Sequence, residues 1–180
     1  SPSQLTETWF SSYQKVNLKN ISLLYVGRIK IEKGIFSLLK IFQNLKIDAK
    51  LSILPVETNY INKKEQKNVE YIKFKNVNGS IKDVYDSHNI FVLPSFTEGH
   101  PQVIDESLSR LRPVIIFEEI NHVIVNRKGI FVSKRDPESL SNTINYIMNN
   151  YETIQDNIRK NVLPTKEAFL KQMSLIINKS

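Results

Sequence analysis

Apolar residues along the chain fall into two alternating patterns, short continuous runs and longer stretches with helical spacing. The short runs are rich in Ile, Val, Leu and Phe, which is typical of strands buried on both faces of a parallel sheet. Between the runs, apolar residues recur every three or four positions, which predicts amphipathic helices; one such set is Ile35, Leu38, Leu39 and Phe42. This alternation predicts βαβ units and an α/β fold.

The pattern predicts a parallel sheet of about six strands flanked by helices. The strands are expected near residues 21–26, 50–54, 69–74, 90–93, 113–117 and 130–132. The helices are expected near residues 34–44, 80–87, 101–111, 137–149, 151–161 and 165–178. Residues 1–20 are mostly polar and include the aromatic residues Trp9, Phe10 and Tyr13, and we expect an incoming linker with a short helix there. Residues 21–180 are expected to form one Rossmann-like domain.

Two cations lie on the turn after the first expected strand. Gly27 interrupts the apolar run, and Arg28 and Lys33 precede the helix expected at 34–44. In an open α/β sheet, ligands bind in the crevice beyond the carboxyl ends of the strands. A guanidinium and an ammonium group there would neutralise a diphosphate, although two cations on a loop are more often only solvated.

A second candidate segment, PSFTEGHPQVIDESL, covers residues 94–108. A strand stops at its first proline, a polar turn follows, and Pro101 is placed to open a helix. Backbone amides at such a sheet edge suit an anion or a sugar nucleotide. Glu98 lies at the mouth of this loop.

The helix expected after this loop carries a second glutamate, Glu106. Helical spacing puts Ile104, Leu108 and Leu111 on one buried stripe. At about 100° per residue, Glu106 lies roughly 200° around the helix from Ile104. We therefore expect Glu106 on an exposed face that points away from the core, where a lone glutamate is usually only solvated.

Together the two segments resemble a known family. VGRIKIEKG (26–34) resembles the phosphate-binding segment, and EGHPQVIDE (98–106) the E-x7-E signature, of the carboxy-terminal domain of retaining glycosyltransferases of the GT-B fold. The similarity to this family of bacterial polysaccharide and glycolipid transferases spans most of residues 21–150. It implies a donor-binding half of a two-domain enzyme. We expect the acceptor-binding amino-terminal domain to be absent from this chain.

The resemblance implies a role for each matching residue. Arg28 and Lys33 would bind the donor's diphosphate and stabilise the leaving nucleotide, Glu98 would contact the transferred sugar, and Glu106 would take the ribose hydroxyls. Cations and helix-terminal amides suit the developing charge, and a carboxylate can accept two hydrogen bonds from a diol. Arg28, Lys33 and Glu98 are thus the expected catalytic residues. The expected donor-binding set is Gly27, Arg28, Lys33, Glu98, Gly99, His100, Pro101, Gln102, Val103 and Glu106.

The chain departs from the family pattern at one rim of the expected cleft. The family usually carries a paired-glycine loop after the strand ending near Phe117, whereas residues 118–129 hold no glycine before Gly129. This departure leaves the identity of the donor open. Among the histidines, His88 is expected to be structural or merely exposed, and His122, in the atypical loop, has no assignable role.

Charge and composition narrow the partners. The net charge of +7, from 25 Lys and Arg against 18 Asp and Glu, invites a nucleic-acid interpretation, but these cations are scattered and no nucleic-acid-binding motif is visible. We expect attraction to phosphorylated donors or to an anionic membrane surface, and no nucleic-acid partner. The lack of cysteine excludes thiolate metal sites and is compatible with the cytosol. We expect a cytoplasmic protein, with peripheral contact at the inner face of the membrane held open.

The sequence therefore predicts the donor domain of a retaining hexosyltransferase in surface polysaccharide assembly, such as capsule or lipopolysaccharide. The donor would be a UDP- or GDP-linked sugar, no metal or other cofactor is expected, and a glycan or glycolipid acceptor would bind through the missing domain. The isolated domain is expected to be inactive. One alternative, a sugar-nucleotide epimerase of the same fold, would lack E-x7-E and need acid and base groups across the cleft. Another, a non-catalytic α/β binding module, would be indifferent to nucleoside diphosphates.

Overall fold

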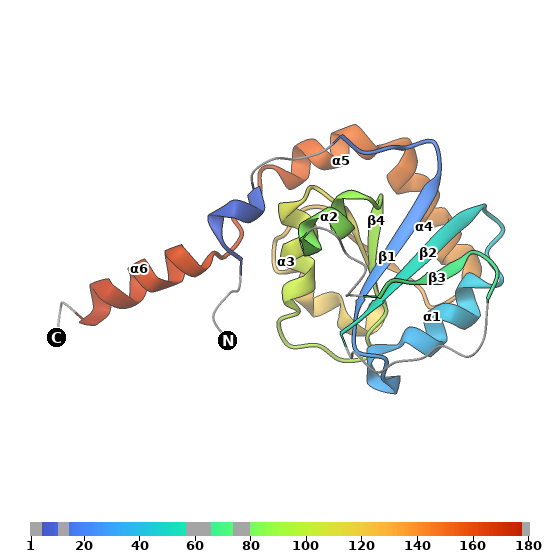
Figure 1. The fold of residues 1–180 in the computed structure, drawn as a ribbon, viewed down its shortest axis with the longest axis horizontal. Coiled ribbons are helices and arrows are strands. Elements are labelled where there is room, and N and C mark those ends of the chain that lie inside the picture. The colour runs from blue at the N-terminus through green and yellow to red at the C-terminus, as the bar shows by residue number, and fades with distance from the viewer. Residues whose placement is uncertain (1–4, 11–14, 57–65, 74–79, 178–180) are drawn as a thin grey trace.

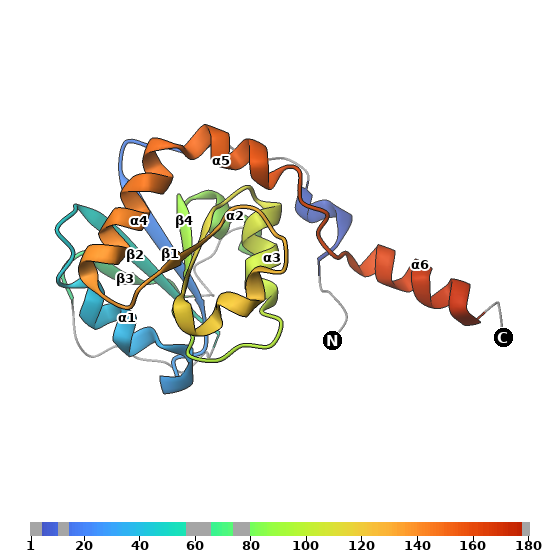
Figure 2. The same cartoon turned by 180° about the vertical axis from the view of Figure 1, so that it is seen from behind.

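Six parallel strands form one sheet in the order β3-β2-β1-β4-β5-β6, flanked by helices (Figures 1 and 2), which confirms the predicted α/β fold. The structure, a computed structural model, describes residues 5–10, 15–56, 66–73 and 80–177. The strands are β1 (Ile21–Gly27), β2 (Ala49–Pro55), β3 (Val69–Tyr71), β4 (Ile90–Leu93), β5 (Val114–Phe117) and β6 (Ile130–Ser133).

The α-helices follow the predicted positions and mostly end a few residues earlier. They are α1 (Ile35–Phe42), α2 (Ile81–Asp86), α3 (Gln102–Ser109), α4 (Pro137–Asn149), α5 (Tyr151–Ile158) and α6 (Lys166–Ile177). Helix α3 stops short of the predicted residue 111 because Leu111 takes a left-handed conformation, with φ 57°. Helix α4 begins as predicted, with the Asp136 side chain accepting a hydrogen bond from the amide of Ser139 at 2.8 Å.

Short 3-10 helices complete the described part of the chain: η1 (Glu7–Phe10), η2 (Ile31–Lys33) and η4 (Glu118–Ile124). The short helix expected within residues 1–20 corresponds to η1, while Tyr13 lies outside the described residues. Strand β3, expected to reach residue 74, ends at Tyr71, and residue 74 also lies outside the described residues.

The sheet is buried at its centre, as its apolar runs predicted. Leu23 on β1, Phe91 on β4 and Ile115 on β5 are each at most 1% exposed. Helix α4 lies behind the sheet in Figure 1 and in front of it in Figure 2, so it covers one face. Helix α6 extends away from the sheet in both views, and its first amide, on Lys166, donates to the Leu5 carbonyl at 2.7 Å. The start of α6 is therefore joined to the amino-terminal segment, whose Leu5 side chain is buried in the core.

The strand order reverses between β1 and β4. From β1 the chain moves outward to β2 and β3, and then returns to the other side of β1 to form β4, β5 and β6. In open α/β sheets, such a reversal leaves a crevice at the carboxyl ends of the two central strands. The turn after β1 carries Arg28 and Lys33, and the loop after β4 carries Glu98. The topology therefore brings the two candidate segments to one place.

These two segments meet backbone to backbone at Gly34. Gly34 has a left-handed φ of 68°, and a Cβ atom built on it would lie 1.8 Å from the carbonyl oxygen of Pro94. Beside this contact, the amide of Phe96 donates to the carbonyl of Glu32 at 3.0 Å. Only glycine combines this backbone conformation with this approach, so Gly34 fixes how closely the turn and the loop pack.

We predict that Gly34→Ala lowers the free energy of unfolding by at least about 2 kcal/mol, because it adds left-handed strain to a clash with backbone. Urea denaturation of the two proteins measures the difference. Gly99→Ala is the matched control, since a Cβ on Gly99 meets nothing within 4 Å; its change should stay within about 0.5 kcal/mol. Equal losses in the two variants would contradict the role of Gly34.

Candidate functional site

The turn after β1 presents Arg28 at the crevice. The buried Tyr25 hydroxyl donates to the carbonyl oxygen of Arg28 at 2.7 Å, and the amide of Lys30 donates to the same oxygen at 3.1 Å. Gly27 makes room for this arrangement, because a Cβ on it would lie 2.6 Å from the Tyr25 hydroxyl. The backbone of the turn is thus held by the buried Tyr25 side chain, while the Arg28 side chain is exposed.

Lys33 and Glu98 form the contact that joins the two segments. The Lys33 ammonium lies 2.6 Å from Oε1 of Glu98, with the side chains 21% and 11% exposed. The Ser95 hydroxyl donates to the same Oε1 at 2.6 Å. Oε2 of Glu98 has no partner among the described residues. A cation and a carboxylate that are 65 positions apart in sequence are therefore side by side, with one carboxylate oxygen still open.

The atypical loop after β5 packs against the Glu98 loop. It folds into η4, whose Ile120 and Val123 are buried in the core. Nε2 of His122 lies 2.8 Å from the carbonyl oxygen of Glu98. Because a carbonyl only accepts hydrogen bonds, Nε2 is the nitrogen that donates. His122, to which the sequence assigned no role, supports the backbone of Glu98.

Arg135 ties the same loop to strands β5 and β6. Its guanidinium carbon lies 4.1 Å from the Phe96 ring centroid and 4.4 Å from that of Phe117. It donates to the Pro94 carbonyl at 3.0 Å and to Glu119 at 2.8 Å. The hydrogen bond from Arg135 lowers the pKa of the Glu119 carboxyl. Sequence reasoning missed Arg135, because its partners come from separate segments and share no motif.

His100 turns toward helix α3. Its Nε2 lies 3.2 Å from Oδ2 of the buried Asp105, whose Oδ1 receives a hydrogen bond from Arg127 at 2.5 Å. The His100 side chain is still 55% exposed, so it borders the open side of the loop. Pro101, predicted as the first helical residue, is the N-cap of α3, and the helix begins one residue later at Gln102. Gln102 and Val103 then follow as half-buried residues of the first turn.

Glu106 does not lie on an exposed face, and the expectation that it points away from the core was wrong. It is half-buried, and its Oε2 accepts a hydrogen bond from the Tyr85 hydroxyl at 2.7 Å. Tyr85 belongs to α2, which lies beside the face of α3 that the helical period assigned to solvent. Burial raises the pKa of the Glu106 carboxyl, the Tyr85 hydrogen bond opposes that shift, and the nearby charge of Asp105 adds to it.

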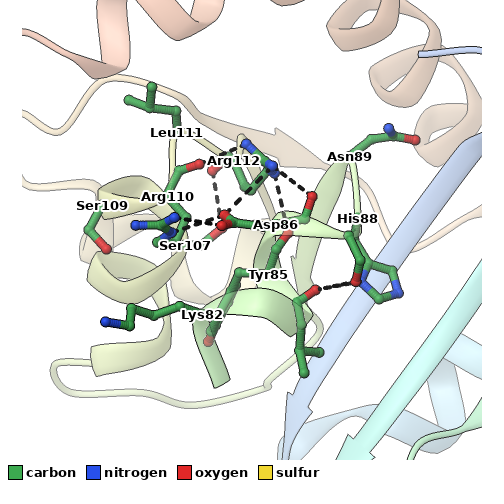
Figure 3. Close-up of polar contacts among 12 residues, drawn as sticks. Lys82, Tyr85, Asp86, His88, Asn89, Ser107, Ser109, Arg110, Leu111 and Arg112 are labelled. Carbon is green, nitrogen blue, oxygen red and sulfur yellow. Dashed lines mark hydrogen bonds and ion pairs between the residues drawn. The ribbon is translucent and has the colours of Figure 1, made fainter. Parts of the chain in front are cut away.

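A buried ion cluster lies next to Tyr85 (Figure 3). Arg110 donates to both carboxylate oxygens of Asp86, at 2.9 and 2.5 Å, and Arg112 donates to the Asp86 carbonyl at 2.7 Å. Each side chain is at most 3% exposed. Arg110 also donates to the Trp9 carbonyl at 2.6 Å. The cluster joins α2, the end of α3 and η1. Sequence reasoning missed it, because charged residues are usually assigned to the solvent-exposed surface.

His88 and Asn89 serve the fold. His88 is buried, with Nδ1 2.7 Å from the carbonyl of Val84, and burial lowers the pKa of its imidazole. The Asn89 amide group donates to the Asn17 carbonyl at 2.7 Å, and its side-chain oxygen accepts from the Ser22 amide at 2.6 Å. His88 therefore holds the end of α2, and Asn89 joins β1 to the segment before it.

Among the described residues, no group of three or more His, Cys, Asp or Glu side chains is placed to hold a metal ion. In the same part of the chain, no helix combines the length and the apolar character that a membrane span needs.

The sequence matches a known family and curated relatives. The profile of the family described as Glycosyl transferases group 1 matches residues 7–162. The capsular polysaccharide biosynthesis glycosyltransferase CapM of Staphylococcus aureus is 31% identical over 168 residues, which are 83% of this chain and 43% of CapM. The putative teichuronic acid biosynthesis glycosyltransferase TuaC of Bacillus subtilis is 28% identical over 118 residues, which are 59% of this chain and 29% of TuaC. The chain thus spans less than half the length of these relatives.

The fold also matches solved structures. Anabaena HepE, crystallised in complex with UDP-glucose, superposes with a TM-score of 0.70 at 15% sequence identity. The superposition covers 90% of this chain and 50% of HepE. At 15% identity the structural similarity shows only a shared fold. Membership of the family is shown by the family profile and by the similarity to CapM.

We predict that Glu106→Gln raises the free energy of unfolding at pH 7. The folded-state pKa of this carboxyl is raised, so its contribution to stability is present at acid pH and is lost as pH rises through that pKa. A neutral amide avoids that loss, and the gain over wild type should shrink toward zero near pH 4, roughly the ordinary pKa of glutamate. Urea denaturation at both pH values measures it.

Glu152→Gln, at an exposed position in the first turn of α5, is the control: it should not raise stability at pH 7, because its charge interacts favourably with the helix dipole. If Glu106→Gln gave the same difference at pH 4 as at pH 7, burial of a charged Glu106 would not be the cause.

Proposed function

The chain belongs to the group 1 glycosyl transferases, and on that premise we propose that it is the donor-binding half of a retaining enzyme. The enzyme would move a sugar from a nucleotide-diphospho-sugar to a glycan or glycolipid acceptor. The observation that carries this proposal is the Lys33–Glu98 contact of 2.6 Å at the reversal point of the sheet. It joins a cation suited to the diphosphate to a carboxylate suited to the sugar.

The diphosphate would lie over the turn after β1. Arg28 is exposed at the mouth of the crevice, and Lys33 lies deeper, against Glu98. The amino-terminal end of α3, which follows Gly99, carries the positive end of the helix dipole. Together these groups offer two cations and a helix amino terminus to one anion. We propose that they bind the diphosphate without a metal ion.

The sugar and the nucleoside would then lie on opposite sides of the diphosphate. The open oxygen of Glu98 faces no described partner and is available to a sugar hydroxyl. One turn or more along α3, Glu106 has Oε2 occupied by Tyr85, which leaves Oε1 for the ribose diol. In this arrangement the two glutamates of the E-x7-E segment bind two different parts of one donor.

The chemistry asked of this half is the departure of the nucleotide. The bond between the anomeric carbon and the diphosphate oxygen breaks, and its electron pair leaves on that oxygen. Arg28 and Lys33 would stabilise the charge that develops there, at a site already organised before the reaction. The donor would be a UDP- or GDP-linked sugar, and the UDP-glucose complex of HepE supports the former.

The other wall of the cleft would come from a second domain. The chain covers 43% of CapM and 50% of HepE, so it matches about half of each. Acceptor residues would lie on the remaining half, and proximity of the two substrates needs both walls. We therefore propose that this half alone transfers no sugar.

The names of CapM and TuaC support a surface polysaccharide as the product. The net charge of +7 supports peripheral contact with an anionic membrane from the cytoplasmic side.

We predict that Arg28→Ala weakens UDP binding by about 1.5 to 3 kcal/mol, the range for charge-assisted hydrogen bonds, when measured by isothermal titration calorimetry. The loss should shrink at high salt, because screening weakens the same interaction in wild type. Lys30→Ala is the matched control, since Lys30 is an exposed cation on the same turn. Unchanged affinity in Arg28→Ala, or an equal loss in Lys30→Ala, would contradict the assignment. A binding module without this function would bind no nucleoside diphosphate at all.

We also predict that the two glutamates separate by ligand. Glu106→Ala should weaken UDP and UDP-glucose alike, by about tenfold, or ~1.4 kcal/mol. Glu98→Ala should weaken UDP-glucose by a similar factor but leave bare UDP unchanged or tighter, because it releases Lys33 for the diphosphate. Calorimetry with both ligands measures this, and Glu118→Ala, at the exposed rim, should alter neither. Equal effects of Glu98→Ala on the two ligands would show that the division is wrong.

A further inference from the structure

Tyr85 is the residue that holds Glu106. Its side chain is fully buried, and its ring packs on Trp9 and Phe91 with centroid distances of 6.0 and 5.7 Å. A buried phenol hydroxyl needs a hydrogen-bond partner, and here the partner is Oε2 of Glu106 at 2.7 Å. Glu106 supplies that partner across the boundary between α2 and α3.

The Tyr85 side chain, which donates this hydrogen bond, is fixed at both ends. At its ring end, Trp9 packs edge-on at an interplanar angle of 67°. At its backbone end, the Tyr85 carbonyl accepts from Arg112 at 3.2 Å, and the next residue, Asp86, is clamped by Arg110 (Figure 3). The Glu106 side chain can rotate about three torsions, whereas the packed Tyr85 side chain has only two. The hydrogen bond from Tyr85 therefore fixes the position of the more mobile Glu106 carboxylate.

We propose that Tyr85 is a positioning residue for nucleoside binding: its hydroxyl holds Oε2 of Glu106 so that Oε1 meets the ribose diol. This rests on the proposed function, in which Glu106 binds ribose. The hydroxyl has two effects. It fixes the Glu106 carboxylate before UDP binds, so that less conformational entropy is lost on binding. It also replaces part of the hydration that the buried carboxylate loses. Through Trp9, the anchoring extends to η1, the segment that enters the domain.

The decisive variant is Tyr85→Phe, which deletes the hydroxyl and keeps the ring. Calorimetry should show UDP affinity falling by about 3- to 10-fold, the effect of one hydrogen bond. Inorganic pyrophosphate, which has no ribose, should bind as in wild type. A merely structural role for Tyr85 would weaken both ligands or neither, and either result would overturn the proposal.

Tyr151→Phe is the matched control. Tyr151 is also buried, and its hydroxyl donates to the Asn89 carbonyl at 2.6 Å, away from Glu106. It should lose stability to a similar extent in urea denaturation and keep full UDP affinity. An equal loss of UDP affinity in Tyr151→Phe would show that general destabilisation, rather than the position of Glu106, explains Tyr85→Phe.

A double-mutant cycle separates this inference from the proposed function. In a Glu106→Ala background, Tyr85→Phe should cause no further loss of UDP affinity, because the carboxylate it positions is gone. If Glu106→Ala alone left UDP binding unchanged, the proposed role of Glu106 would fail. If Glu106→Ala weakened UDP but Tyr85→Phe did not, only the positioning role of Tyr85 would fail.

Trp9→Ala replaces Tyr85→Phe if the latter does not fold. Trp9 lies half-buried on η1, and its substitution removes one wall of the Tyr85 ring while keeping the carbonyl that accepts from Arg110. UDP affinity should fall by about 2- to 5-fold with pyrophosphate binding unchanged, since a looser donor positions Glu106 less well. Unchanged UDP affinity in a folded Trp9→Ala protein would overturn the proposal.

Discussion

The close approach of two backbones at Gly34 and Pro94 is the constraint on which the site depends. The reversal of strand order brings the two segments to one crevice, but the missing side chain at Gly34 determines how near they come. The Lys33–Glu98 ion pair follows from that distance. Half-buried pairs contribute little net stability, because desolvation offsets attraction. The pair therefore matters chiefly for geometry, and a bound diphosphate could compete with Glu98 for Lys33.

The Glu98 loop is then held from three further directions. His122, on η4, contacts the Glu98 carbonyl, and Arg135, after β6, stacks on Phe96. The Asp105 carboxylate contacts both His100 and Arg127. The glycine-free segment after β5 is central to this support, because it buries apolar side chains and turns polar ones toward the loop. The departure from the family pattern thus provides contacts to the Glu98 backbone.

Most of the fold and part of the site could be predicted from the sequence. Apolar runs and helical spacing located the strands and helices, and the order of elements brought Arg28, Lys33 and Glu98 to one crevice. The environment of Glu106 could not be predicted, because helical spacing orders residues around one helix and does not reveal that α2 lies beside its second face. The Asp86 cluster was missed for a related reason: a pattern of charges does not show which of them pair in the interior. Two arginines flanking Leu111 just before a buried strand were the available signal.

A crystal structure of this chain with UDP bound would test whether the two segments form one nucleotide site. We expect the diphosphate against Arg28, Lys33 and the amino-terminal end of α3, with the ribose hydroxyls on the Glu106 oxygen not held by Tyr85. UDP bound elsewhere, such as the hollow of about 850 Å³ lined by Lys46, Gln66 and Asn68 at the opposite end of the strands, would contradict it. So would UDP in the crevice with its ribose turned away from Glu106.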